Sequence, residues 1–247
     1  MIFGKKNEVH ISLRRFRPSG RVIRQIYDVG LPSVVLQAIG TVMNLAMNAI
    51  LIAFSETAVA VFGVYFKVQS IAIMPLLGLT NTAMSIIAYN YGARSKPRMM
   101  RTWRLTVISG VVMMVLMTTL FQILPRQILA LFNASDDMLR IGLSALRIMP
   151  LCLPFSAISI SCSIMFQAVG KGSYSMFVSL ARQLVALVPA AWLLARLTGD
   201  VTAVWWSFPI AELVSISLSV SLFVLVYRTR IRPLGSAPSV AEAVGTV

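Results

Sequence analysis

The residues of this chain that could do chemistry are polar side chains set at helical spacing inside long apolar stretches. In residues 29–53 such side chains recur at steps of 4, 4, 3 and 4: Ser33, Gln37, Thr41, Asn44 and Asn48. In residues 138–169 a second set recurs at steps of 4, 3, 4 and 4: Cys152, Ser156, Ser159, Ser163 and Gln167. Each set lies on one face of a helix. Each face could therefore bind a polar ligand through hydrogen bonds.

Two interpretations of these faces remain open. Small hydroxyl side chains at this spacing also occur simply where membrane helices pack closely. Amide side chains have several hydrogen-bonding sites and are costly to leave unpaired in an apolar medium, so they favour a wet cavity. We expect the cavity to be lined by polar residues of three helices: Gln37, Thr41, Asn44, Asn48, Gln69, Ser163 and Gln167.

Three charged residues inside the apolar stretches are candidates for a buried ion pair: Lys67, Arg182 and Glu212. Lys67 lies 9 residues after position 58, where one apolar stretch begins, and Glu212 lies 9 residues after position 203, where another begins. The two residues should therefore sit at equal depth, and a lone buried charge is costly, so we expect them to form an ion pair. Arg182 could reach Glu212 instead by extending along its helix. The pair is either purely structural or couples an ion to transport, and the sequence leaves both readings open.

Pro75 should bend the helix that carries Lys67. Proline removes one backbone donor and clashes with the preceding turn, which frees a carbonyl near Ile71. Gly78 follows three residues later and makes the segment easier to deform. A bend inside a membrane helix is tolerated where it lines a cavity.

Enzyme chemistry has no support in the sequence. The chain contains no HExxH, GxSxG or Walker motif, and its single histidine is His10. Its two cysteines, Cys152 and Cys162, lie ten residues apart on one expected helix, too far for a disulfide. We therefore expect no catalytic residues, no metal site, no cofactor and no enzyme activity.

The elements that must position these residues are membrane helices. Hydrophobic residues make up 57% of the chain and charged residues 12%, and the mean hydropathy is +0.82, a balance that argues against a soluble helical domain. Six apolar runs could each cross about 30 Å of hydrocarbon: 29–53, 58–91, 103–124, 138–169, 174–196 and 203–227. The runs are continuous, unlike the alternating segments of a membrane barrel. The prediction is an all-α membrane protein with six transmembrane helices.

The distribution of basic residues among the loops predicts the orientation of the chain in the membrane. Sixteen of the 22 basic residues fall in the leader, the loops near 94–104 and 171, and the tail, and three fall on the other side (Arg126, Arg140 and Arg196). This bias predicts an inner (plasma) membrane protein with both termini cytoplasmic. It gives no folded basic surface with interleaved aromatic residues, so nucleic acid is not an expected partner.

We divide the chain into three parts: a basic cytoplasmic leader (1–28), the transmembrane part (29–227) and a cytoplasmic tail (228–247) that we expect to be disordered. The leader is unlike a signal peptide and resembles a loop between helices.

Several segments together resemble the multidrug and toxic compound extrusion (MATE) family of transporters, over about residues 10–230. They are VGLPSVVLQAIGTVMNLAMNAIL (29–51), AVAVFGVYFKVQSIAIMPLLGLTNTAMSIIAYNYGAR (58–94), ALFNAS (130–135) and FQAVGKGSYSMFVSLARQ (166–183). The motif FPIAE (208–212) points to one branch of multidrug export proteins. The most specific combination is a proline-bent helix followed by YNYGAR.

This resemblance implies a fold and a function. The family has twelve helices in two six-helix lobes and exports cationic compounds in exchange for H⁺ or Na⁺. This chain resembles only the second lobe, so we expect a fragment, a split gene or a truncated product that needs a first lobe or a second copy as its partner, besides membrane lipid. No acid lies on the first or fourth expected helix, where some branches hold one, which leaves Glu212 as the candidate for ion coupling. The alternatives are half of a lipid-linked oligosaccharide flippase, or a remnant without activity.

Overall fold

The chain is helical throughout the part that the structure describes. The computed structural model describes residues 19–235, with the side chains of all but several residues between 21 and 37 and of residue 72. The long helices are α1 (Gly20–Leu51), α2 (Glu56–Gly92), α3 (Lys96–Ile123), α6 (Leu153–Ala168) and α10 (Ser207–Val226). Shorter α-helices are α4 (Pro125–Ala130), α5 (Asp136–Ile148), α7 (Gly172–Leu180), α8 (Val188–Thr198) and α9 (Val201–Trp205). No strand occurs within residues 19–235.

Several of these helices join into longer rods. The 3₁₀ segment η2 (Met149–Cys152) links α5 to α6, and the π-helical segment η3 (Ala181–Leu187) links α7 to α8. The π-helical segment η4 (Tyr227–Ile231) and the 3₁₀ segment η5 (Arg232–Gly235) extend α10. Each of the six predicted apolar runs therefore corresponds to one helical rod, and the rods end at the predicted breaks.

The breaks are fixed by local hydrogen bonds that the loop residues supply. Ser55 Oγ accepts a hydrogen bond from the backbone N–H of Ala58, and Asp200 Oδ1 accepts one from Thr202. Such side chains satisfy backbone donors that have no partner in the first turn of a helix. Gly199 ends α8 with φ of 62°, a left-handed conformation in which glycine avoids the steric cost of a side chain.

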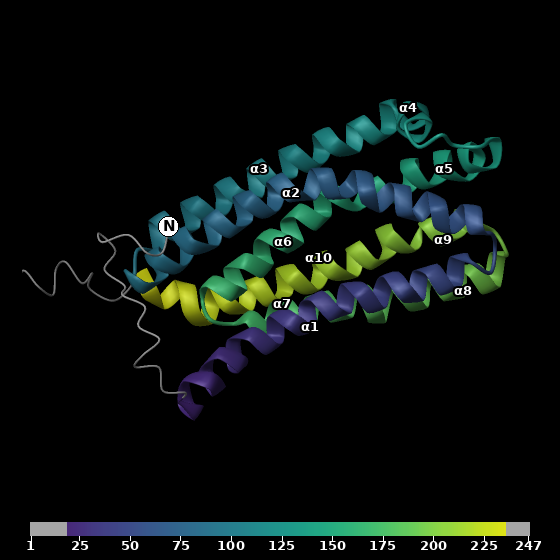
Figure 1. The fold of residues 1–247 in the computed structure, drawn as a ribbon. Helices are drawn as coiled ribbons and strands as arrows, with labels where there is room; N and C mark the ends of the chain where they lie inside the picture. The colour runs from purple at the N-terminus through teal and green to yellow at the C-terminus, as the bar shows by residue number, and fades with distance from the viewer. Residues whose placement is uncertain (1–18, 236–247) are drawn as a thin grey trace, which may run out of the picture.

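The rods pack side by side in one bundle, with α6 and α10 between two outer pairs (Figure 1). α6 contacts α2, α3, α7 and α10, while α1 packs on α7 and α8. We call one end of the bundle the basic end: it holds the turns at 93–95 and 169–171 and the segment 227–235 (Figure 1). Arg94, Lys171 and the described cations of the tail lie on these segments, and Lys96, Arg98, Arg101 and Arg104 follow in the first turns of α3. Arg126, Arg140 and Arg196 lie on α4, α5 and α8.

Two apolar clusters hold the bundle together. The larger one includes Met47, Phe62, Phe121, Leu146 and Trp205, all at most 2% exposed. The smaller one lies toward the basic end, and its members include Ile87, Met99, Met165, Phe166 and Ile231. Close packing of such large side chains stabilises the bundle through dispersion contacts, because lipid tails are as apolar as the side chains and transfer out of water adds little between membrane helices.

Fewer rods satisfy a length and hydropathy test for spanning than the six predicted. Four do so: Lys96–Ile123, Asp136–Ala168, Gly172–Thr198 and Val201–Leu234. α2 is a fifth if its two halves count as one span, and the apolar part of α1, Ala38–Leu51, is shorter than a span among the described residues. The first part of the predicted run 29–53 lies among the residues of α1 whose side chains the structure does not describe, so the full length of that run stays a prediction. The all-helical membrane fold itself is confirmed.

The bend predicted in α2 is present. Its halves, Glu56–Ile71 and Ile73–Gly92, meet at 43°. α2 stays helical through the bend, and Pro75 lies four residues after Ile71, whose carbonyl lacks a helical N–H partner because proline has none. Gly78 lies within the second half.

The helices extend past the predicted ends of the transmembrane part. α1 begins nine residues before position 29, inside the predicted leader, and helical turns continue to Gly235 in the tail that we expected to be disordered from residue 228. The apolar side chain of Ile231 explains the latter, because it is fully buried in the smaller cluster. The predictions for residues 1–18 and 236–247 lie outside the described residues.

Candidate functional site

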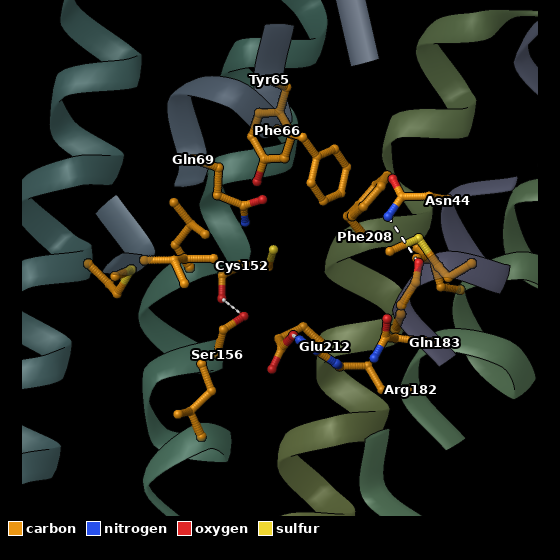
Figure 2. Close-up of a pocket in the computed structure, with 18 of the residues that line it drawn as sticks. Asn44, Tyr65, Phe66, Gln69, Cys152, Ser156, Arg182, Gln183, Phe208 and Glu212 are labelled. Atoms are coloured by element: carbon orange, nitrogen blue, oxygen red, sulfur yellow. Dashed lines mark hydrogen bonds and ion pairs between the residues drawn. The ribbon is translucent and has the colours of Figure 1, made fainter. Parts of the chain in front are cut away.

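A cavity of about 270 Å³ opens between α1, α2, α3, α6, η3 and α10 (Figure 2). We call it the main cavity. Most of its wall is apolar or aromatic, including Phe66 and Phe208. The polar side chains in the wall are Asn44, Tyr65, Gln69, Ser156, Arg182, Gln183 and Glu212. An apolar cavity with a few convergent polar groups is typical of a binding site.

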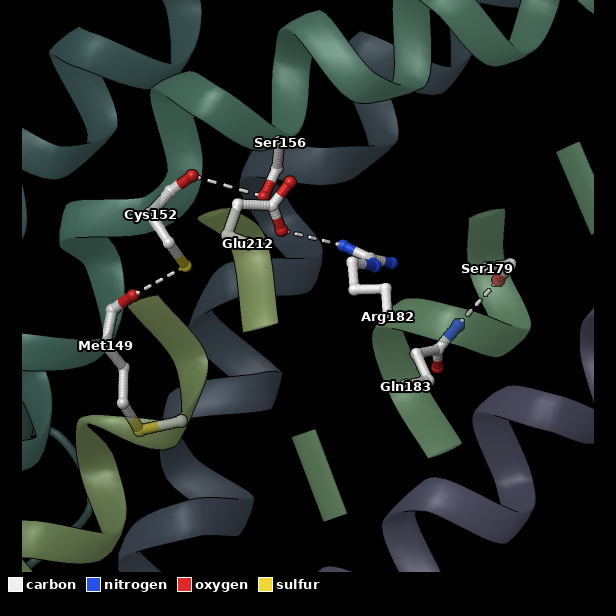
Figure 3. Close-up of polar contacts among 7 residues, drawn as sticks. All are labelled: Met149, Cys152, Ser156, Ser179, Arg182, Gln183 and Glu212. Atoms are coloured by element: carbon white, nitrogen blue, oxygen red, sulfur yellow. Dashed lines mark hydrogen bonds and ion pairs between the residues drawn. The ribbon is translucent and has the colours of Figure 1, made fainter. Parts of the chain in front are cut away.

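Among the described residues that line the main cavity, the charged ones, Arg182 and Glu212, form an ion pair in its wall. Arg182 Nη1 donates a hydrogen bond to Glu212 Oε2 over 3.2 Å (Figure 3). The Glu212 side chain is 5% exposed and that of Arg182 is 32% exposed. The second carboxylate oxygen, Oε1, is buried and has no hydrogen-bond partner. The pair is therefore asymmetric: the acid is enclosed, while the guanidinium reaches a more open space.

Local helix geometry brings the two residues together. Glu212 lies on the inward stripe of α10, which continues through the buried residues Ser215 and Ser219 at steps of three and four. Arg182 and Gln183 lie in the first turn of the π-helical segment η3, and the Gln183 amide donates a hydrogen bond to Ser179 Oγ over 2.7 Å. π-helical segments inside α-helices occur frequently at functional sites.

The predicted pair between Lys67 and Glu212 does not form. Lys67 is exposed on α2, and no described acid lies within ion-pairing distance of it. Its neighbours Tyr65 and Gln69 line the main cavity, and a residue two positions from each lies on the opposite side of an α-helix. Equal depth was a sound criterion, but it gave no information about the direction of the side chain. Arg182, the alternative partner, takes the place of Lys67.

The polar residues that we predicted to share one cavity are divided between two. Asn44 and Gln69 line the main cavity, and the Asn44 amide also donates to the carbonyl of Gly40 over 3.0 Å. Ser163 and Gln167 line a second cavity of about 140 Å³, which we call the serine chamber. Its wall is formed by Ser159, Ile160, Ser163, Gln167, Ser175, Val178, Ser179, Arg182 and Ser215.

The remaining predicted residues lie elsewhere. Thr41 and Asn48 are on α1 but line neither of these cavities. The Gln37 side chain lies outside the described residues. The role of all seven residues in contacting substrate stays a prediction.

Sequence reasoning did not single out Tyr65, and it placed Cys152 and Ser156 on a polar face without locating the irregular turn that contains Cys152. Tyr65 is 1% exposed, and its hydroxyl has no partner where it meets the main cavity. Cys152 ends the 3₁₀ segment η2, and its Sγ lies 3.0 Å from the Met149 carbonyl, while Ser156 Oγ donates to the Cys152 carbonyl over 3.2 Å (Figure 3). Pro150 lies within this irregular segment and Pro154 lies two residues after it. These two prolines are the sequence signal that could have located the segment.

Metal ligands do not gather in this site. Within the described range, no three side chains of His, Cys, Asp or Glu come together in a way that could hold a metal ion.

Comparison with known proteins identifies the relatives of the chain. Residues 32–193 match the family model described as MatE. The Multidrug export protein MepA of Staphylococcus haemolyticus is 26% identical over 231 residues, which covers 93% of this chain and 50% of the relative. MepA of Staphylococcus saprophyticus is 25% identical over 227 residues, covering 92% and 49%. The chain thus spans about half the length of the curated relatives it matches.

Solved structures give the same result. A multidrug resistance MATE family transporter of the MOP superfamily superposes with a TM-score of 0.81 in an outward-facing conformation, at 25% identity, covering 94% of this chain and 51% of that one. An inward-facing conformation gives 0.80 at 25% identity, covering 96% and 55%. A MOP superfamily transporter from Pyrococcus furiosus gives 0.81 at 26% identity, covering 93% and 51%.

Proposed function

Because the chain belongs to the MatE family, we propose that it works as the second six-helix lobe of a secondary multidrug antiporter, which exports cationic compounds in exchange for an ion. The observation that carries this proposal is the buried Arg182–Glu212 pair in the main cavity, in a chain that matches about half the length of multidrug export proteins. An ionisable pair inside a membrane bundle is costly and is commonly retained for function.

The match to two transporter conformations supports a rocking mechanism. The chain superposes almost equally on structures described as outward-facing and inward-facing, with TM-scores of 0.81 and 0.80. A lobe that keeps its shape in both states moves as a rigid body against the other lobe, as in alternating access by secondary transporters. A first six-helix lobe, or a second copy of this chain, supplies the other wall.

Glu212 is the group that couples the ion, and we infer that the ion is H⁺. The carboxylate is enclosed and has one oxygen without a partner. A proton needs only that oxygen, whereas a metal cation needs several oxygen ligands and would be repelled by the guanidinium 3.2 Å away. Protonation weakens the attraction of Glu212 for Arg182, so the pair opens and closes as the cavity alternates.

The flippase alternative has less support from the site. Recognition of a pyrophosphate-linked lipid calls for an excess of basic groups, because phosphates are bound by clusters of charge-assisted hydrogen bonds. The main cavity contains one guanidinium and one carboxylate, which cancel. The other alternative, a remnant without transport activity, is tested by the export experiment described in the next paragraph.

Export of ethidium from cells tests the proposal. We expect the chain alone to insert into the membrane without exporting ethidium, and to export it when a first lobe from a full-length relative is fused to its N-terminus. In the fused protein Glu212→Gln should abolish export driven by an imposed proton gradient, while the matched control Asp137→Asn, which removes an exposed carboxylate, should retain it.

Two results would contradict the proposal. Full export by Glu212→Gln would remove this carboxylate from coupling. Export by the chain alone would favour a homodimer over a single lobe that needs a different partner.

We also propose that the chain is a multi-pass protein of the inner (plasma) membrane with its basic end in the cytoplasm. The support is the excess of Lys and Arg on the turns at that end, together with the start of α1 and the end of η5 lying at the same end of the bundle (Figure 1). Tags at both termini should be protected from protease added outside intact cells. Cleavage of either tag there would refute this orientation.

A further inference from the structure

The serine chamber contains buried hydroxyl groups that nothing in the protein satisfies. Ser159 and Ser215 are 4% and 1% exposed, and neither Oγ has a hydrogen-bond partner. Ser219, one turn further along α10, is likewise unpaired, whereas two buried serines outside the chamber bond to their own helix: Ser161 donates to the Ala157 carbonyl and Ser207 to the Val204 carbonyl, each over 2.7 Å. A serine in a membrane helix normally forms such a bond to its own backbone when no other partner is present. The two unpaired chamber hydroxyls therefore indicate that the chamber holds small molecules able to form hydrogen bonds with them.

The volume and the wall of the chamber suit water. About 140 Å³ accommodates several water molecules, each of which occupies about 30 Å³ in the liquid. Arg182 and Gln167 add N–H donors to hydroxyl groups from three helices, so a water molecule finds the two to four polar partners that a buried site requires.

The chamber extends from the basic end to the ion pair. Gln167 lies in the last turn of α6 and Ser175 in the first turns of α7, on either side of the turn at 169–171. Ser159 lies ten residues before Val169, about 15 Å along the helix. At its inner limit the chamber meets Arg182, which lines the main cavity as well, whereas Glu212 lines only the main cavity.

We propose that the serine chamber is a water-filled access path, internal to this lobe, that leads from the basic end to the guanidinium of Arg182 and is closed from the main cavity by the Arg182–Glu212 pair. Water in the chamber solvates the guanidinium face that Glu212 does not contact. When Glu212 is protonated the pair is open, so chamber water can contact the carboxyl group, accept its proton and carry it to the basic end as hydronium, and the carboxylate that remains re-forms the pair with Arg182. The role of Glu212 rests on the proposed function, but the existence of the path does not.

Reaction of introduced cysteines with Ag⁺ tests the path. Thiols react as thiolates, which form readily only in contact with water, and Ag⁺ is small enough for the chamber. The native Cys152 and Cys162, both buried, are first replaced by alanine. Single variants Ser159→Cys, Ser163→Cys and Ser215→Cys are then exposed to Ag⁺ in right-side-out or inside-out vesicles, and unreacted thiols are counted with a maleimide dye after denaturation.

Ser109→Cys is the matched control. Ser109 lies 13 residues into α3 from Lys96 on an outward apolar face with Leu105, Ile108 and Val112, which are 52–54% exposed. We expect the chamber cysteines to react at least tenfold faster than this control, and only when Ag⁺ is on the side of the turn at 169–171. A variant that fails to fold will not elute as one symmetric peak in size-exclusion chromatography. If Ser159→Cys or Ser215→Cys fails in this way, Ser163→Cys is the variant compared with Ser109→Cys.

Three results would overturn the proposal: rates equal to that of Ser109→Cys, fast reaction only from the opposite side, or equal reaction from both sides with Arg182 intact. The vesicles contain no drug and no imposed gradient, so the outcome is independent of export. A chain with fast chamber cysteines whose fused form does not export would retain the path and lose the proposed function.

Discussion

The main cavity and the serine chamber share one wall, yet they differ in the chemistry they offer. Arg182 and Ile160 line both, but the main cavity adds aromatic rings, amides and a carboxylate, whereas the chamber adds hydroxyl groups and has no acid in its wall. One side of the guanidinium is therefore neutralised by charge and the other is available for solvation. A single arginine thus separates a cavity whose wall is mostly apolar from one whose wall is mostly hydroxyl-bearing.

Of the substitutions proposed for this chain, removal of one member of the ion pair should lower the free energy of unfolding most. It also tests directly whether the two sides of the Arg182 guanidinium differ in solvation. We expect Arg182→Ala to lower the free energy of unfolding by about 3–5 kcal/mol, because the enclosed Glu212 loses its compensating charge. Glu212→Gln should lower it by less, because water in the serine chamber still solvates Arg182. Unfolding of the purified chain in mixed detergent micelles provides the measurement.

The control for this prediction is the exposed pair Asp137–Arg140, whose side chains are 77% and 81% exposed at 3.7 Å. Arg140→Ala should change the unfolding free energy by less than about 1 kcal/mol. Equal losses for Arg182→Ala and Glu212→Gln would mean that the two sides of the guanidinium do not differ in solvation.

Straightening α2 should alter the main cavity and leave the serine chamber unchanged, because α2 lines only the former. Pro75→Ala restores an N–H for the Ile71 carbonyl, and we expect the bend of 43° to fall below about 20°, the range of helices without a kink. Pulsed EPR distances between spin labels at Ala60 and Ala88, both exposed, measure the change. Pro97→Ala, in the first turn of α3, is the control. An unchanged distance would assign the bend to packing rather than to proline.

Deleting the Tyr65 hydroxyl should have the smallest effect. This group has no protein partner, so Tyr65→Phe should change the unfolding free energy by less than about 0.5 kcal/mol, compared with about 1 kcal/mol for Ser207→Ala, which loses a buried hydrogen bond. The same unfolding assay compares them. A larger loss for Tyr65→Phe would indicate that the main cavity, like the chamber, holds ordered water.

The sequence predicted the helices well because length, hydropathy and capping are local properties. The runs ending near Ser55 and Gly199 are stopped by residues whose backbone chemistry is readable without a structure. The site was predicted less well. The face formed by Ser156, Ser159 and Ser163 reads as one stripe, yet Ser156 lines the main cavity and the other two the chamber, because the partition depends on how α7 and α10 pack against it.

The orientation of Lys67 also depends on contacts between helices that the sequence does not show. Its depth in α2 was predictable, but the face that turns inward is decided by the aromatic cluster of Phe62, Tyr65 and Phe208, which forms only when α2 and α10 meet. Arg182 was harder still to place, because nothing in the sequence ARQLVAL (181–187) signals a π-helical turn.

That π-helical turn makes the ion pair depend on residue number as well as residue type. A chain that runs through η3 with i to i+5 hydrogen bonds accommodates one residue more than an α-helix of the same length. Deleting one residue from 184–187 would let the segment become a regular α-helix of the same length and leave α7 and α8 in their present orientation, whereas a deletion in the regular helix α8 would turn the residues beyond it by about 100°. The change would be confined to the residues of η3, which include Arg182, so the position of the guanidinium opposite Glu212 depends on the number of residues in this segment as well as on their types.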